Sequence, residues 1–240
     1  MHALPVFEKA EAYLQVQLTR SGPGGTAHPA GPFVTISRES GAGGTTLARS
    51  LAERLPRDED AHPWTVYSAN LIEEMLRTNE LPVQLARFLP EDRISEIDSA
   101  VGELVGLHPS LWVLVEKTNQ LVRQLAQVGH TIVLGRGANF ATSGIHHGVH
   151  VRLVAPAKWR AERTARWLGL DVDSAAIENA RRDAARQRYV RATFAADVAD
   201  ATAYDLVINT AQVPVDTSVD IIAGFVRAHQ RNAADMTLHR

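Results

Sequence analysis

The pattern of apolar and polar positions divides the chain into short strands and amphipathic helices. Residues 33–37, FVTIS, form an apolar β-rich run that predicts a buried strand, and the glycine-rich stretch RESGAGG follows it. Leu47, Leu51 and Leu55 then recur every four residues, which places them on one face of a helix. The order of strand, glycine turn and helix is typical of the first unit of an α/β domain.

Segments of both kinds alternate along the rest of the chain. The continuous apolar run TIVL at residues 131–134 predicts a strand that is buried on both sides, as in a parallel sheet. The alternation predicts an α/β fold in which a mainly parallel sheet has helices on both faces. Further strands are predicted at 64–67, 149–154 and 206–209, and helices at 70–127 with breaks at prolines, 158–168, 173–194 and 218–227.

The two ends of the chain are predicted to lie outside the main domain. Residues 1–30 contain an amphipathic stretch with helical spacing and then a linker rich in glycine and proline. We therefore expect an appended N-terminal helix, a main domain at residues 31–230 and a tail at residues 231–240. The apolar face of the appended helix offers a means of forming a homodimer.

Composition excludes several classes of protein. With 45% hydrophobic and 22% charged residues, the 240-residue chain has the composition of a globular protein, without the run of roughly 18 apolar residues that a membrane-spanning helix needs. Glu8 and Glu11 interrupt any secretory signal, so we expect a cytoplasmic location. The absence of cysteine rules out disulfides, thiolate zinc sites and cysteine nucleophiles.

The charged residues limit the partners that the protein can bind. A net charge of −2 argues against a surface that binds nucleic acid over its whole extent. Of the 25 basic residues only three are lysines, namely Lys9, Lys117 and Lys158. Any bound anion must therefore be held mainly by arginine guanidinium groups and backbone amides.

Residues 40–46, SGAGGTT, end the first strand and begin the first helix. Ligands of parallel sheets bind at the carboxyl ends of the strands, and glycines let several backbone amides turn toward one point beside the positive end of a helix dipole. A plain turn that only links strand to helix is the alternative. We predict a site for ATP or another phosphate ligand, with the hydroxyl of Thr45 reaching Mg²⁺ directly or through a water, at Gly41, Ala42, Gly43, Gly44, Thr45 and Thr46.

The P-loop pattern G-x-x-x-x-G-K-[ST] fits this segment only in part. With Gly43 in the place of the second glycine, Arg38 stands at the first glycine and Gly44 at the lysine. Arg38 is a candidate catalytic residue because its guanidinium can supply the missing positive charge; its alternative is an ion pair with Glu39 or Glu53. The G-x-G-x-x-G pattern of dinucleotide-binding proteins is absent.

The segment VTISRESGAGGTTLARSLAERL resembles the first strand, loop and helix of the cytidylate kinase-like family, a branch of the nucleoside monophosphate kinases. The segments VLGRGANF, VRLVAPAKWRAERTAR and YDLVINT are similar in the same order, so the resemblance covers about residues 33–228. It implies a P-loop kinase-like three-layer fold, ATP as phosphoryl donor and a nucleoside monophosphate or similar acceptor. It also implies a helical acceptor-binding insert at about 70–128 and an arginine-rich lid at about 173–194.

The resemblance further implies roles for several residues. Arg136, in the Gly-Arg pair after the predicted strand at 131–134, would hold the phosphate of the acceptor. In the lid, Arg181 and Arg188 would be catalytic, with Asp183 as their orienting partner and Arg191 in support. The alternative for this helix is a solvated basic surface whose arginines pair with acidic residues on the same helix.

Departures from the family's pattern keep a second function open. Gly137 and Ser68 stand where the family commonly has an aspartate. Together with the missing lysine, they allow a nucleotide-binding regulatory or scaffold protein with the kinase fold and lost or weak catalysis. Arg160 and Arg163 have two interpretations, a role in the site or an ion pair. A P-loop hydrolase is disfavoured because no acidic residue follows TIVL, and the histidines lack the spacing of a zinc site.

Overall fold

The computed structural model describes residues 31–56, 63–68, 108–135 and 137–238. The expected N-terminal helix and its linker, most of the helical insert, and Arg136 lie outside the described residues. The expectations placed on them, including the homodimer, stay predictions.

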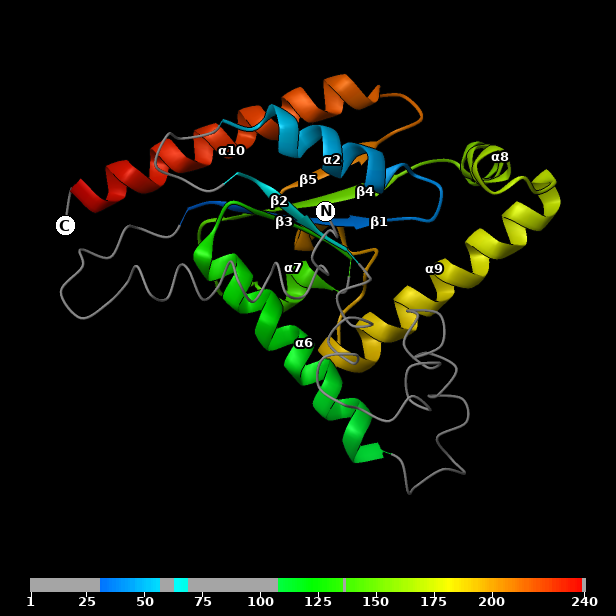
Figure 1. Cartoon of the computed structure of the whole chain (residues 1–240), viewed down its shortest axis with the longest axis horizontal. Helices are drawn as coiled ribbons and strands as arrows, with labels where there is room; N and C mark the ends of the chain where they lie inside the picture. The colour runs from blue at the N-terminus through cyan, green and yellow to red at the C-terminus, as the bar shows by residue number, and fades with distance from the viewer. Residues whose placement is uncertain (1–30, 57–62, 69–107, 136, 239–240) are drawn as a thin grey trace, which may run out of the picture.

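Five strands form one sheet in which every neighbouring pair is parallel. Their order is β2-β3-β1-β4-β5, so β1 lies at the centre and its residue Phe33 is in register with Thr131 and Gly148 (Figure 1). The predicted α/β fold with a parallel sheet is confirmed. The strands are β1 (Phe33–Arg38), β2 (Thr65–Tyr67), β3 (Thr131–Leu134), β4 (Gly148–Val154) and β5 (Leu206–Asn209).

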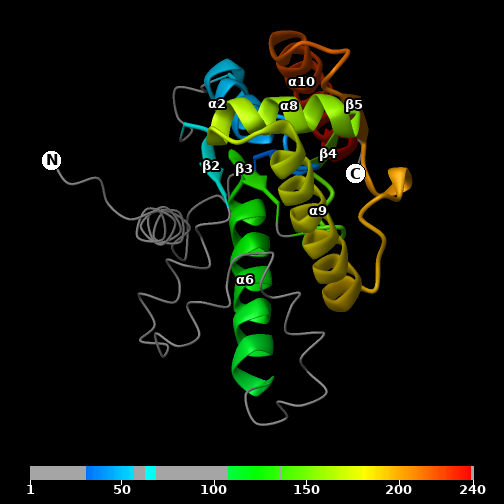
Figure 2. The ribbon, with the colours of Figure 1, turned by 90° about the vertical axis from the view of Figure 1, so that its right-hand side faces the viewer.

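Helices cover both faces of the sheet, which gives the three layers that were expected. Helices α2 and α10 lie together on one face, and α6 and α7 lie on the other (Figure 1). Helices α8 and α9 pack on each other at the side of the sheet toward which β1 points (Figures 1 and 2). The helices are α2 (Gly44–Arg54), α6 (His108–Val128), α7 (Ala138–Ala141), α8 (Ala157–Leu168), α9 (Val172–Phe194) and α10 (Val215–Leu238), with a 3-10 turn at Ala201–Ala203.

The core lies where the apolar runs predicted it, between the sheet and the α2–α10 layer. Val34, Ile36 and Ile132 on the central strands are fully buried, and Leu47 and Leu51 of α2 pack against them. Burial of each such side chain contributes on the order of 2 kcal/mol to folding. This core fixes the carboxyl end of β1 relative to the start of α2.

The last helix is longer than the sequence predicted. Helix α10 extends to Leu238, whereas the helix was predicted at 218–227, so most of the expected tail at 231–240 is the end of a helix. The start of α9 is fixed by Asp171, whose side chain accepts a hydrogen bond from the Ser174 N–H at 2.8 Å. None of the helices in the described part of the chain is long and apolar enough to cross a bilayer.

Two half-buried histidines lie against the start of β1. The rings of His147 and His150 meet the ring of Phe33 edge-on, and His150 Nδ1 shares a hydrogen bond with the Thr35 hydroxyl at 2.8 Å. His147 Nε2 lies 3.1 Å from the Ala126 carbonyl oxygen. Burial lowers the pKa of both rings below the ordinary value of 6.5.

We expect the free energy of unfolding to fall as the pH is lowered through 6.5 toward the depressed pKa values. Over that window the unfolded chain binds protons at His147 and His150 that the folded chain does not, which costs up to about 1.4 kcal/mol per pH unit for each ring. His147→Gln with His150→Asn keeps amide groups near the bonded nitrogens and should flatten this slope. Urea unfolding between pH 5 and about pH 8 measures it; an unchanged slope in the double variant would contradict the assignment.

Candidate phosphate-binding site

The turn between β1 and α2 depends on glycines in the left-handed backbone region. Gly41 has a φ of 80°, and Gly43, the N-cap of α2, has a φ of 87°. The Ala42 N–H donates to the Glu39 carbonyl oxygen at 3.2 Å, and the side chain of Ala42 is buried in the core. The turn is therefore held at the carboxyl end of the central strand, where a parallel sheet binds its ligands.

Helix α8 packs directly on this turn. A Cβ atom at Gly41 would lie 2.6 Å from the Arg160 carbonyl oxygen and 2.8 Å from the Thr164 hydroxyl oxygen. A Cβ atom at Gly43 would lie 3.2 Å from Nη2 of Arg163. The absence of a side chain at Gly41 thus leaves room for the backbone of α8. The absence of a side chain at Gly43 leaves room for a guanidinium group.

Arg160 joins α8 to the turn through nearly buried polar contacts. Its side chain is 12% exposed, and it donates hydrogen bonds to the carbonyl oxygens of Ala155 and Ser40, both at 2.9 Å. Its guanidinium forms ion pairs with Asp183 at 2.8 Å and with Glu39 at 3.3 Å. Two carboxylates compensate the burial of this one cation. The ion-pair interpretation of Arg160 therefore fits the structure.

Asp183 ties α9 to the same turn. Its carboxylate accepts a hydrogen bond from the Ser40 N–H at 2.7 Å and pairs with Arg186 at 3.0 Å. Arg186 also donates to the Ser40 hydroxyl oxygen at 2.6 Å. The ion pair with Arg160 completes the cluster. Together these contacts hold α8, α9 and the glycine turn as one unit.

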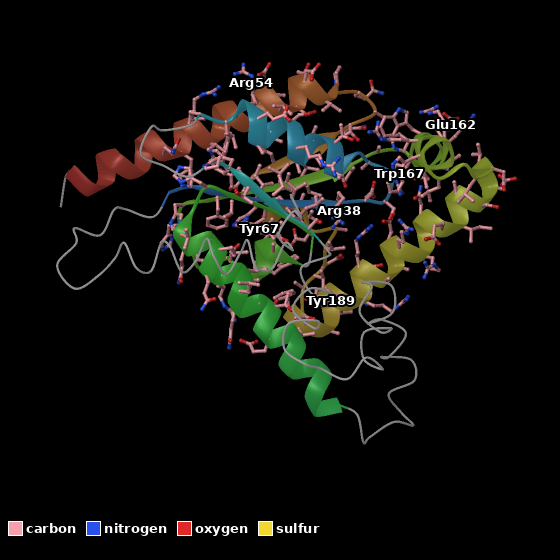
Figure 3. All side chains as sticks on the ribbon, in the orientation of Figure 1. Arg38, Arg54, Tyr67, Glu162, Trp167 and Tyr189 are labelled. Atoms are coloured by element: carbon pink, nitrogen blue, oxygen red, sulfur yellow. The ribbon has the colours of Figure 1, made fainter. Side chains whose placement is uncertain are left out.

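A pocket of about 500 Å³ lies over the turn, between α2, α8 and α9. Glu39 is the one carboxylate among the described residues that line it, and Trp167, 79% exposed, lies at its side on α8 (Figure 3). The excess of positive charge in a concave site suits an anionic ligand. The arginines that line this pocket are Arg38, Arg49, Arg163, Arg166, Arg182 and Arg186.

A second, smaller pocket of about 20 Å³ lies at the ends of β1 and β3. Ser37 and Gly135 line it from the strand ends, and Tyr189 lines it from α9. Arg38 and Arg186 line both pockets. These two arginines are therefore shared by the large pocket over the turn and the neighbouring strand end.

Most of the residues predicted for the phosphate site line the large pocket. They are Arg38, Gly41, Gly43, Gly44, Thr45 and Thr46. Ala42 does not, because its methyl group belongs to the core below the turn. The hydroxyl-bearing residues Thr45 and Thr46 are exposed at the start of α2, where the sequence placed them.

The structure differs from the sequence-based choice of arginines on α9. Arg181 is held by Glu178 at 3.0 Å with its side chain 44% exposed, Arg188 and Arg191 are exposed, and none of the three lines either pocket. Asp183 forms ion pairs with Arg160 and Arg186.

The sequence contained a signal for the face of α9 that turns toward the large pocket. Tyr189 and Val190 are buried, so they fix which side of the helix faces the protein. Arg186 and Arg182 precede Val190 by four and eight residues and therefore share its face. The spacing of the arginines among themselves does not reveal this face. Ser40 carries no sequence signal, because its contacts depend on the positions of α8 and α9.

The structure explains one of the two departures from the family's pattern. Gly137 is the N-cap of α7 with a φ of 61°, and a Cβ atom there would collide with the ring of Phe194. An aspartate side chain therefore has no room at this position. Ser68 follows β2 at the edge of the sheet and lines neither pocket.

The fold and the site together define an α/β protein with a glycine-rich turn and an arginine-lined pocket at the carboxyl end of its central strand. The family model of the cytidylate kinase-like family matches residues 33–212, and the chain belongs to this family, as the resemblance indicated. This membership supports a nucleotide kinase-like function.

Two of its relatives are named cytidylate kinase. The cytidylate kinase of Methanopyrus kandleri is 25% identical over 197 residues, which cover 79% of this chain and 90% of the relative. The cytidylate kinase of Halorubrum lacusprofundi is 25% identical over 198 residues, 82% of this chain and 90% of the relative. A crystal structure of an uncharacterised protein from Eubacterium ventriosum matches with a TM-score of 0.60 and 18% identity over 82% of this chain and 98% of that one, which shows a shared fold.

Gly41→Ala should destabilise the protein more than Gly169→Ala. Both glycines have positive φ, but a Cβ atom at Gly169 meets nothing within 4 Å, so alanine there costs only backbone strain of about 1 kcal/mol. At Gly41 the methyl group must also displace the Arg160 carbonyl, and we expect a total loss of about 3 kcal/mol. Urea unfolding of both variants measures the difference. Equal losses would mean that α8 does not rest on the turn.

Proposed function

We propose that the protein transfers a phosphoryl group from ATP to a nucleoside monophosphate or a similar small acceptor. The observation that carries this proposal is the arginine-lined pocket of about 500 Å³ over the glycine turn, whose residues Arg38 and Arg186 also lie at the ends of β1 and β3. Membership of the cytidylate kinase-like family supports it independently.

The large pocket has the size and charge for the donor's phosphates. The glycine turn and the first residues of α2 offer backbone amides, and the positive end of the α2 dipole lies beside them. Glycine at positions 41, 43 and 44 lets the chain approach a phosphate without a side chain in the way. A triphosphate bound here would have its terminal phosphate near Arg38 and Arg186.

The acceptor would bind on the side of the smaller pocket. This pocket lies at the end of β3, directly before Arg136, which the family resemblance assigns to the acceptor's phosphate. Arg136 and the insert at 70–128, which would select the acceptor, belong to the proposal on the strength of that resemblance.

Catalysis in this arrangement rests on charge neutralisation. Phosphoryl transfer spreads negative charge over the transferred group, and fixed cations beside it lower the barrier without covalent chemistry. Nη1 of Arg186 donates to both Asp183 and the Ser40 hydroxyl oxygen, which holds the guanidinium in place. Arg38 at the end of β1 stands on the rigid centre of the sheet. The two arginines would act from opposite elements on the same group.

The described residues fit a magnesium ion that is bound mainly by the nucleotide. They contain no group of three or more acidic or histidine side chains that would hold a metal alone. The exposed hydroxyl of Thr45 lines the pocket at the start of α2 and would be a protein ligand, with phosphate oxygens and waters as the others. When bound, Mg²⁺ would neutralise the charge of the donor's phosphates.

The regulatory or scaffold alternative also has an observation in its favour. The Ser40 N–H is occupied by the carboxylate of Asp183, so the protein's own anion sits on the turn that would receive phosphate. A protein that binds a nucleotide without transferring its phosphate is consistent with this contact and with the missing lysine at Gly44.

A coupled assay of ADP formation with Mg-ATP and each common nucleoside monophosphate separates the two functions. Transfer to at least one acceptor well above background ATP hydrolysis supports the kinase. Binding of ATP by calorimetry without transfer to any acceptor would leave the nucleotide-binding alternative.

Arg186→Met should lower kcat by about 10²- to 10³-fold, as expected for the loss of one preorganised charge at the reacting group. Arg54→Met is the control, because Arg54 is half exposed, pairs with Asp220 on the α2–α10 surface and lines neither pocket (Figure 3). Steady-state kinetics on both variants provides the measurement. A loss of kcat in Arg181→Met but not in Arg186→Met would show that transfer takes place elsewhere.

A further inference from the structure

The glycine turn lacks the cation that a P-loop carries at the start of its helix. Gly44 stands in the place of that lysine. A Cβ atom at Gly44 would lie 3.1 Å from Cγ of Arg38 and 3.3 Å from Cδ1 of Leu134. The space where a lysine side chain would begin is therefore filled by the stem of Arg38 and by a core leucine. A positive charge at this place has to come from a side chain outside position 44, such as Arg38 or an arginine of another element.

Arg163 of α8 brings a guanidinium to the turn. Its Nη2, Cζ and Nε atoms lie 3.2, 3.4 and 3.6 Å from the Cβ position of Gly43, so the group lies across the N-cap of α2. The three similar distances mean that the guanidinium presents a face, and not its tip, to the glycine. Arg163 also lines the large pocket over the turn.

This position is unfavourable for a cation unless an anion joins it. The N-terminus of α2 carries the positive end of the helix dipole, and the first turn of α2 has no acidic residue. Within the described part of the chain, Arg163 makes no hydrogen bond or ion pair, and its recorded partner is the ring of Trp159, 5.7 Å from Cζ. A phosphate between the guanidinium and the helix end would satisfy both.

Neighbouring side chains point to a ligand in the same pocket. Asn179 lines it and is 4% exposed; its Oδ1 accepts from the Thr164 hydroxyl at 3.0 Å, while its Nδ2 has no partner among the described residues. A buried amide without a partner costs free energy that a ligand or water oxygen would recover. Arg49 and Arg166 add two further cations that form no ion pair with described residues.

The contacts that fix α8 on the glycine turn also set the position of Arg163 relative to Gly43. Arg160, three residues earlier and so on the same face of the helix, is bound to Ser40, Glu39 and Asp183. The contact of Gly41 with Arg160 and Thr164 sets the distance between α8 and the turn. The guanidinium is therefore positioned by a rigid contact one helical turn away.

We propose that Arg163 supplies, from α8, the cation that the glycine turn lacks at Gly44, and that it binds the second and third phosphates of a polyphosphate ligand. The inference rests on the proposed function for the identity of that ligand as ATP. It also means that the phosphate site is complete only while α8 rests on the turn.

Calorimetric titration with sodium tripolyphosphate, Mg-ATP and AMP tests the role of Arg163 without any need for catalysis. Arg163→Met should weaken tripolyphosphate and ATP binding about 10- to 100-fold, the range for loss of a hydrogen bond between charged groups. AMP, which has a single phosphate, should bind equally well to both. Arg163→Lys should recover part of the loss, because it restores the charge but not the fork.

Lys158→Met is the matched control, since Lys158 is an exposed cation on the same helix that lines neither pocket. It should bind all three ligands as the wild type does, and thermal unfolding of each variant confirms that the fold is kept. Equal tripolyphosphate affinity in wild type and Arg163→Met overturns the inference, as does a wild type that binds no tripolyphosphate. Tripolyphosphate binding that needs Arg163, in a protein that transfers no phosphate, would sustain the inference and reject the proposed kinase.

Discussion

The site depends on one close approach, that of α8 to the backbone of Gly41. The approach leaves no room for a side chain at Gly41, and it brings Arg160 within reach of the Ser40 carbonyl oxygen and of two carboxylates. A cation in such surroundings is held only where its partners are complete, so α8 has one stable position on the turn. The other charged groups of the pocket are placed relative to that position.

Five arginines at the carboxyl edge of the sheet fall into two groups by what holds them. Arg160 and Arg186 are bound to Asp183 and Ser40, and they link three segments that are far apart in sequence. Arg49, Arg163 and Arg166 have no ion pair among the described residues and line the pocket. The first group builds the site and the second leaves charge available for a ligand. Arginine suits both tasks because one guanidinium can donate in several directions.

Side chains of α9 occupy polar groups of the glycine turn in this structure. In this structure the Asp183 carboxylate takes the Ser40 N–H, and the Arg186 guanidinium takes the Ser40 hydroxyl oxygen. The contacts that hold Arg186, which also lines the smaller pocket, therefore occupy the backbone N–H and the hydroxyl of Ser40 in the turn. Because Asp183 lies on α9 and Gly41 contacts α8, any movement of the two helices changes the geometry around the glycine turn and the position of Arg186 together.

The sequence by itself determined the order of strands and helices, the parallel sheet and the place of the glycine turn, because these follow from local apolar runs and from residues next to one another in the chain. It placed Gly41, Gly43, Gly44 and Thr45 at the pocket for the same reason. Only the tertiary structure decided which arginines meet them. Neighbouring residues on a helix differ by about 100° in direction, so the packing of Tyr189 and Val190 selects Arg186 over Arg188. The distance between α8 and the turn, which brings Arg163 to Gly43, is set by contacts across more than a hundred residues of chain.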